Sequence, residues 1–410
     1  MQHRARVDAM RARRRRRGDG DDERHRTHAF DVAVEVEVAS IGDVASRHNL
    51  VRTFGNGRVI ARDMSTRARG SETRAMTRAM TRGMTIMTRL ASRRVRRAST
   101  AGDGGVGASR RLMTFLCERA PFVDFASQRE AFESRAYDGA VHPDFPSSSS
   151  SAAAVSVSDA ESASMGAWVP AAVRTVAGSA CEDVSAIRRR ALDAVEASRG
   201  VERCAILCVS GDARADVGRG MTSEDVLREL SSMRRRGDVP RETTLLAVAN
   251  PMLGAVEAER MMRKRELGAE GFITQPGFLR ERFDRWRDAA DRVGALDGFS
   301  RDGGPNGLAG LFLGVCAPRS AKNIEFWCAL TGVDVDADAE ARTLRDEYAR
   351  RARDMSRERF DDWTFERVEL ALVHAVSFER ALGAHVMPVT KGGYAHAARL
   401  ARDVLPIFRV

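Results

Sequence analysis

Residues 255–278 read AVEAERMMRKRELGAEGFITQPGF and contain one complete copy of the pattern that decides the fold. The first half, Ala255–Glu266, mixes charged and apolar residues as an amphipathic helix does. The second half holds a short apolar run, Gly271–Thr274, which precedes a proline and is typical of a buried strand. A chain that alternates such helices and strands is expected to build a parallel sheet.

The same alternation continues over residues 111–410. The candidate strands are eight short apolar runs: Leu112–Cys117, Ala154–Ser158, Val169–Val176, Cys204–Ser210, Leu245–Ala249, Gly271–Thr274, Leu308–Cys316 and Ala384–Val389. The helical patterns between them are Ser179–Arg199, Ser223–Arg236, Ala255–Glu266, Phe278–Val293, Ala321–Leu330 and Asp361–Leu382. This order predicts an α/β fold, a single (β/α)8 TIM barrel over residues 111–410. An open doubly wound sheet is the alternative, but GxGxxG does not follow the first strand and GxxxxGK[ST] is absent.

The composition supports a globular body and excludes several classes of protein. The chain has 410 residues and a mass of 45.0 kDa, and 43% of its residues are hydrophobic, so it is neither collagen-like nor wholly disordered. The longest nearly continuous apolar run, Gly307 to Ala317, is too short for a bilayer span. Six cysteines stand in no CxxC or Cys/His metal spacing, so we expect reduced thiols in an intracellular protein and no metal site.

The positive charge is concentrated near the N-terminus. Residues 1–110 hold 25 Arg and 12 acidic residues, whereas residues 111–410 hold 42 basic and 45 acidic ones. The run Arg13–Arg17 could bind RNA. The basic part has almost no aromatic residues between its charges, however, so nucleic acid is not the expected partner. Residues 1–110 are predicted to be a disordered, arginine-rich extension.

Within this extension, residues 64–102 have a pattern of their own. From Arg74 the chain repeats Thr-Arg-Ala-Met, which places arginines and methionines on separate helical stripes. No acidic residue occurs between Glu72 and Asp103. An amphipathic, arginine-rich and acid-free segment is typical of an organellar transit peptide, with Met64 as the start of the chain. The expected location is a mitochondrion or plastid, or the cytoplasm if the segment is a linker.

Polar residues follow most of the candidate strands. In a TIM barrel the functional groups lie at the carboxyl ends of the strands, so these residues should meet at one rim. They are Glu118, Ser158, Asp159, Gly211, Asp212, Asn250, Gln275, Thr390, Lys391 and Tyr394. Each one alone could be a turn or cap residue, and the prediction of a site depends on the whole set.

Several of these stretches, in order, resemble the methylenetetrahydrofolate reductase family. The strongest is Lys264 followed by GAEGFITQPGF at 268–278; VSVSD at 155–159, VSGD at 209–212, VANP at 248–251, GVCAPRS at 314–320 and HVMP at 385–388 add to it. The resemblance covers residues 112–410 and is closest to the compact bacterial type. It implies a barrel that binds FAD, takes a hydride from NAD(P)H and reduces 5,10-methylenetetrahydrofolate to 5-methyltetrahydrofolate.

The resemblance also implies roles for individual residues. Glu118 would be the general acid and Asp212 would face both flavin and folate. Gln275 and Tyr394 would bind the folate substrate. The FAD site would contain Ser158, Gly211, Asp212, Ala249, Asn250, Arg260, Arg263 and Lys264. We expect no membrane span, and the question of a homo-oligomer stays open.

The chain also departs from the family pattern. The stretch after the third strand, Ala177–Cys181, carries no charge, and Ser210 stands where many members have arginine. A serine-rich insertion, Ser147–Ser151, falls in the first strand-to-helix connection. Two alternatives therefore stay open: a non-catalytic or divergent barrel that binds folate or flavin, and an RNA-associated protein that acts through its basic arm.

Overall fold

The computed structural model describes residues 113–120, 123–144, 169–211, 220–299 and 303–409. The chain divides into two compact units, Met1–Ala101 and Gly102–Val410, and every described residue belongs to the second. The arginine-rich extension and its transit-like segment at 64–102 lie outside the described residues, so the predictions made for them stay predictions.

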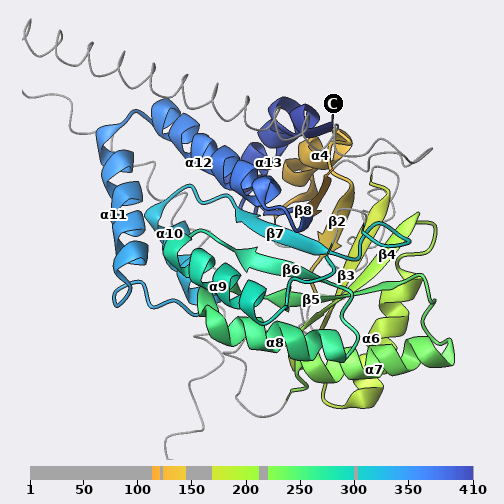
Figure 1. Cartoon of the computed structure of the whole chain (residues 1–410). Coiled ribbons are helices and arrows are strands. Elements are labelled where there is room, and N and C mark those ends of the chain that lie inside the picture. Colours follow the sequence, from red (N-terminus) through yellow and green to blue (C-terminus); the bar gives the residue numbers. More distant parts are fainter. Residues whose placement is uncertain (1–112, 121–122, 145–168, 212–219, 300–302, 410) are drawn as a thin grey trace, which may run out of the picture. The chain divides into compact units, whose positions relative to one another are not determined.

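Eight parallel strands form a closed barrel in which each strand pairs with its neighbour in sequence and β8 pairs with β1 (Figure 1). The strands are β1 Thr114–Glu118, β2 Gly139–His142, β3 Ala171–Ala177, β4 Arg203–Val209, β5 Thr244–Ala249, β6 Gly271–Pro276, β7 Leu311–Cys316 and β8 Ala381–Met387. This closure confirms the predicted (β/α)8 TIM barrel.

Helices alternate with the strands on the outside of the barrel (Figure 1). They are α4 Phe125–Glu133, α6 Val184–Glu196, α7 Ser223–Arg236, α8 Ala255–Glu266, α9 Arg280–Arg292, α10 Ala321–Leu330, α11 Ala339–Asp354, α12 Arg357–Ser377 and α13 Lys391–Asp403, with short 3-10 turns η1 Gly178–Ala180, η2 Pro251–Leu253 and η3 Leu405–Arg409. The bounds of α7, α8 and α10 agree with the sequence prediction, whereas α4, α11 and α13 were not predicted. None of the helices in the described part of the chain is both long and apolar enough to cross a membrane.

The second strand is the main error of the sequence prediction. It was placed at Ala154–Ser158, which lies outside the described residues, whereas the barrel uses the four residues Gly139–His142. This run is short and begins with glycine, so it carries a weak apolar signal. A residue with a Cβ atom would be crowded at position 139, because this atom would lie 2.8 Å from Leu116 Cδ2 and 3.0 Å from Ala171 O. The close approach of β1, β2 and β3 therefore selects a residue that apolar patterns overlook.

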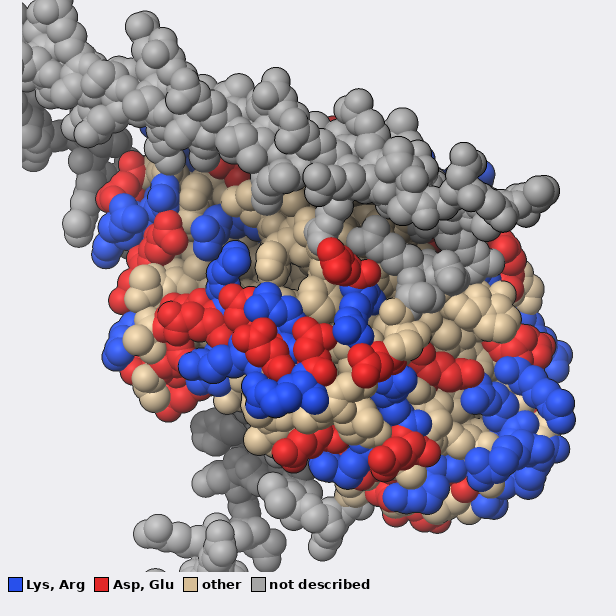
Figure 2. Space-filling view, in the orientation of Figure 1, with Lys and Arg blue, Asp and Glu red and all other residues tan. Residues whose placement is uncertain are grey.

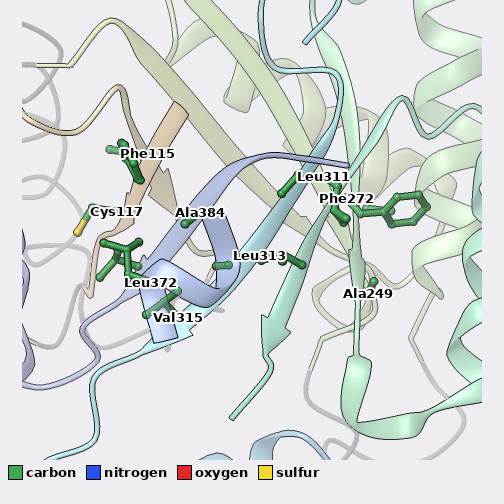
Figure 3. Packing of buried hydrophobic residues seen from close by; sticks show 14 of the residues in the cluster. Phe115, Cys117, Ala249, Phe272, Leu311, Leu313, Val315, Leu372 and Ala384 are labelled. Atoms are coloured by element: carbon green, nitrogen blue, oxygen red, sulfur yellow. The ribbon is translucent and has the colours of Figure 1, made fainter. Parts of the chain in front are cut away.

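Two apolar layers are separated by the strands. Inside the barrel, inward side chains including Leu116, Val173, Leu246 and Phe312 form one cluster. A larger cluster lies outside, and Figure 3 shows part of it, with Phe115 and Cys117 of β1 labelled. Because side chains alternate along a strand, Leu116 and Glu118 face inward when Phe115 and Cys117 face outward. The last residue of β1 therefore enters the mouth of the barrel.

Barrel closure gives a test of stability at Gly383. A Cβ on Gly383 would lie 1.6 Å from the main-chain oxygen of Thr114, on the strand that closes the ring. We expect Gly383→Ala to lower the free energy of unfolding by about 3 kcal/mol or more, at or above the upper end of ordinary overpacking. Urea denaturation followed by circular dichroism measures this change.

The matched control is Gly310→Ala. Its Cβ would lie 2.9 Å from the nearest atom, Leu382 Cβ, whereas the Cβ at position 383 would lie 1.6 Å from main-chain oxygen. The cost should be clearly smaller than at Gly383. Equal losses in the two variants would contradict the proposed role of close strand contact at the β1–β8 closure.

Candidate active site

Glu118, at the mouth of the barrel, is a weaker acid than an ordinary glutamate. Its side chain is 23% exposed, and burial raises its pKa from 4.5 to about 7. Burial has this effect because a carboxylate loses more solvation than a neutral carboxyl group does. Near neutral pH the protonated and ionised forms of Glu118 are therefore both populated, as a general acid requires.

His385 lies beside this carboxyl group. It is the fifth residue of β8, and its Nε2 is 3.6 Å from Glu118 Oε2. Its side chain is almost completely buried, and burial lowers its pKa from 6.5 to about 3, so the ring is neutral near pH 7. Neither ring nitrogen has a hydrogen-bond partner among the described residues. The acid thus has a polar neighbour that adds no positive charge.

The sequence prediction did not assign His385 to the site. The signal that could have found it is its place in a strand whose other residues are apolar or glycine, AL-G-A-H-V-M at 381–387. A single polar ring in such a strand must face either the barrel interior or the surrounding helices. Strand alternation alone cannot choose between them, because β7 and β8 shift in register near Leu311 and Phe312.

Gln275 lies on β6 at the same end of the barrel, two residues beyond the inward Ile273. The pairing of β6 with β7 shifts in register between Ile273 and Pro276, and the N–H of Gly314 donates to Thr274 Oγ1 at 2.9 Å. Such irregularities often redirect a side chain next to a site. The buried Oε1 of Gln275 has no hydrogen-bond partner in the described structure, which leaves its capacity to accept a hydrogen bond unused.

Tyr394, predicted to bind substrate, is fully buried on α13. Its hydroxyl group accepts a hydrogen bond from Ala120 N and donates one to Glu118 O, both at 2.7 Å. Both hydrogen bonds of the hydroxyl group are thus made to main-chain atoms of the turn that follows β1. The structure therefore brings Tyr394 and Glu118 together, although through the backbone of Glu118.

The three predicted cations lie along α8, where each faces an acidic group. Lys264 is buried, and its Nζ donates to Val248 O at 2.6 Å and to Glu257 Oε1 at 3.2 Å. Arg260 reaches the other oxygen of the same Glu257 at 3.7 Å. Arg263 is exposed and lies 3.5 Å from Glu224. Lys264 therefore pairs with the buried carboxylate of Glu257 on the same helix, and the exposed charge belongs to the two arginines.

The remaining predicted residues have structural contacts or lie outside the described residues. Asn250 Oδ1 accepts from Met252 N at 3.1 Å, and its Nδ2 donates to Thr331 O at 3.0 Å. Ala249 is buried at the end of β5. Gly211 has φ of +90°, and a Cβ there would lie 1.7 Å from Ser179 Oγ, so the turns after β3 and β4 touch at this point. Ser158 and Asp212 lie outside the described residues.

Taken together, the described side chains give a titratable carboxyl group at the barrel mouth and a separate set of ion pairs on α8. Glu118 and His385 come from the two strands that close the barrel, and Gln275 comes from β6. No group of three His, Cys, Asp or Glu side chains that could hold a metal ion occurs in the described parts of the barrel. The arrangement can donate a proton to a bound heterocycle and accept a hydrogen bond from it.

Comparison with known proteins adds little to this geometry. No family model matches the chain, and no curated protein matches it. A crystal structure of an uncharacterized protein aligns with 72% of this chain and 71% of its own, at 9% sequence identity and a TM-score of 0.29. A likeness at this level carries no functional argument, so the family resemblance stays a prediction.

The raised pKa of Glu118 has a consequence for stability. Because the folded chain binds this proton more tightly than the unfolded chain, the contribution of Glu118 to stability falls as pH rises from about 4.5 to about 7 and does not change further above that. Glutamine cannot titrate. Relative to wild type, Glu118→Gln should therefore become more stable across this window, by up to about 3 kcal/mol.

Urea denaturation of both proteins between pH 5 and 8 measures this difference. Glu259→Gln is the control, because Glu259 is exposed on α8 and its carboxyl group stays in water whether or not the chain is folded. The quantity to compare is the difference in free energy of unfolding between each variant and wild type. If this difference changes with pH no more for Glu118→Gln than for Glu259→Gln, Glu118 does not hold its proton in the folded state.

Proposed function

We propose that this protein is a flavin-dependent reductase that converts 5,10-methylenetetrahydrofolate to 5-methyltetrahydrofolate with NAD(P)H as hydride donor. The resemblance of the sequence motifs suggests the reaction. The observation that carries the proposal is the buried Glu118 carboxyl group at the barrel mouth, whose pKa is about 7. A reaction of this class needs an acid of that strength.

The need follows from the substrate. The five-membered ring of 5,10-methylenetetrahydrofolate opens to an iminium ion only after one of its nitrogens is protonated. An ordinary glutamate is almost fully ionised near pH 7 and has no proton to give. Glu118 retains one because it is buried. After Glu118 donates its proton, it is a carboxylate. Because His385 is neutral, no positive charge on this ring stabilises the carboxylate, so the group recovers its proton readily.

The described residues fit a flat, hydrogen-bonding ring. The unpartnered Oε1 of Gln275 accepts a hydrogen bond from a ring N–H, which both flavins and pterins offer. Val248 gives an apolar wall inside the barrel near the end of β5, whereas the neighbouring Ala249 packs in the outer cluster. Arg260 and Arg263, exposed on α8, are the cations that would hold phosphates. Bound FAD would supply the hydride relay between nicotinamide and folate.

The alternatives differ in what they require. A barrel that binds folate or flavin without catalysis would share these contacts but would need no acid of raised pKa. An RNA-associated protein would depend on the basic extension, which lies outside the described residues. Figure 2 shows acidic and basic side chains interleaved on the face that carries α8 and α9, with no continuous basic surface there. Glu118 therefore favours the catalytic proposal.

The proposal is tested by separating the two half-reactions of the purified full-length chain. We expect a yellow protein whose flavin absorbance is bleached by NADH or NADPH without oxygen and restored by 5,10-methylenetetrahydrofolate. Because only the folate step needs an acid, Glu118→Gln should slow reoxidation by about 10²–10⁴-fold and leave bleaching nearly unchanged. Stopped-flow absorbance measures both rates.

Glu259→Gln, on the exposed side of α8, should leave both half-reactions as they are in wild type. Flavin that is bound and bleached but never reoxidised by the folate would favour a different substrate. A protein that binds no flavin, or a Glu118→Gln variant with wild-type reoxidation, would contradict the proposed function.

A further inference from the structure

The buried hydroxyl group of Tyr394 joins the last helix of the barrel to the end of its first strand. It lies 2.7 Å from Glu118 O and 2.7 Å from Ala120 N, 276 and 274 residues away in the sequence. The donor and acceptor it contacts belong to the turn that begins at Glu118. Tyr394 is fully buried, so no solvent competes for these hydrogen bonds.

The turn needs this partner because the sheet ends just before it. Arg119 N donates to Val141 O at 2.8 Å, which continues the pairing of β1 with β2. The next donor, Ala120 N, goes to Tyr394 instead. A buried main-chain group without a partner would be costly, so Tyr394 takes over where the sheet stops.

A second side chain holds the same turn from α4. Gln128 Nε2 donates to Ala120 O at 2.8 Å and to Val123 O at 2.6 Å. Gln128 is also buried. Main-chain groups of Glu118, Arg119 and Ala120 therefore all have fixed partners, and the Glu118 backbone has little freedom to rotate. The carboxyl group is held toward the barrel mouth, 3.6 Å from His385 Nε2.

We propose that Tyr394 is a positioning residue that fixes the Glu118–Ala120 turn and thereby holds the Glu118 carboxyl group in the barrel mouth. This role replaces the substrate contact predicted from the sequence. Its importance for catalysis rests on the proposed function. The placement of the carboxyl group does not, because it is measurable without any substrate.

The surroundings of Glu118 make its pKa a sensitive measure of placement. Among the described residues, the titratable groups near it include His385 on β8, Cys117 on β1 and Tyr394 on α13. All three are neutral near pH 7, because burial lowers the pKa of His385 and raises those of Cys117 and Tyr394. Arg119 is the adjacent cation. The pKa of Glu118 is raised because burial excludes water from its carboxyl group. If the turn were displaced, water would reach this group and its pKa would fall.

The test is a titration of Glu118 by ¹³C NMR in the full-length chain, labelled at glutamate carboxyl carbons, with Glu118→Gln to assign the resonance. The wild-type midpoint should lie near 7. Tyr394→Phe, which keeps the ring and removes the hydroxyl, should lower it by about one pH unit or more toward the ordinary value of glutamate. In the folate half-reaction, the same variant should move the pH optimum downward.

Tyr137→Phe is the matched control. Tyr137 is also buried, and its hydroxyl donates to Ala397 O of the same helix α13 at 2.9 Å, without touching the Glu118 turn. The Tyr137→Phe variant should lose about as much stability as Tyr394→Phe but leave the titration midpoint of Glu118 unchanged. A folded Tyr394→Phe protein with the wild-type midpoint, or an equal shift in Tyr137→Phe, would overturn the positioning role.

Gln128→Met decides the question if Tyr394→Phe does not fold, because it removes the other restraint on the same turn. It should lower the midpoint in the same direction, and a wild-type midpoint would overturn the proposal. The two proposals fail separately. An active Glu118→Gln enzyme would refute the proposed function and leave the titration result standing. An unchanged titration would refute positioning and leave the acid role of Glu118 intact.

Discussion

The Glu118 carboxyl group sits in the barrel mouth with a neutral imidazole 3.6 Å away, and its pKa of about 7 comes from burial. A cation at that distance would favour the carboxylate and return the pKa to the acidic range. The strength of this acid therefore depends on how well the surrounding backbone excludes water. The close pairing of β1 with β8 and the buried turn after β1 both serve that exclusion.

Charge is distributed in the opposite way along α8. Lys264 neutralises the buried Glu257, and Arg260 and Arg263 face solvent beside acidic partners. The barrel thus has a titratable carboxyl group where β1 meets β8 and a set of ion pairs on α8. A ligand with a heterocyclic ring and anionic groups suits this arrangement. A cation beside Glu118 would favour its ionised form, and phosphates would have no partner without the arginines of α8.

Much of the fold was predictable because the barrel repeats one local pattern. The helices α7, α8 and α10 follow from apolar spacing and clear end signals, such as Thr222 before α7 and Gly237 after it. Seven of the eight strands were found with bounds within three residues of the observed ones. β2 was missed because Gly139 is selected by neighbouring backbone. β8 begins three residues before its predicted start because glycine interrupts its apolar run.

The site was less predictable because its geometry depends on contacts between distant segments. The position of Glu118 at a strand end was readable, but its burial and its neighbours were not, because His385 and Tyr394, which contact its side chain and its main chain, lie more than 260 residues further along the chain. Lys264 illustrates how a contact across the fold can offer another explanation for a residue that the sequence singles out. Its rarity in an arginine-rich chain suggested a cofactor contact, yet its Nζ is held by Val248 O and Glu257. A buried carboxylate explains a buried lysine without any ligand, because an unpaired charge there would be far more costly than the pair.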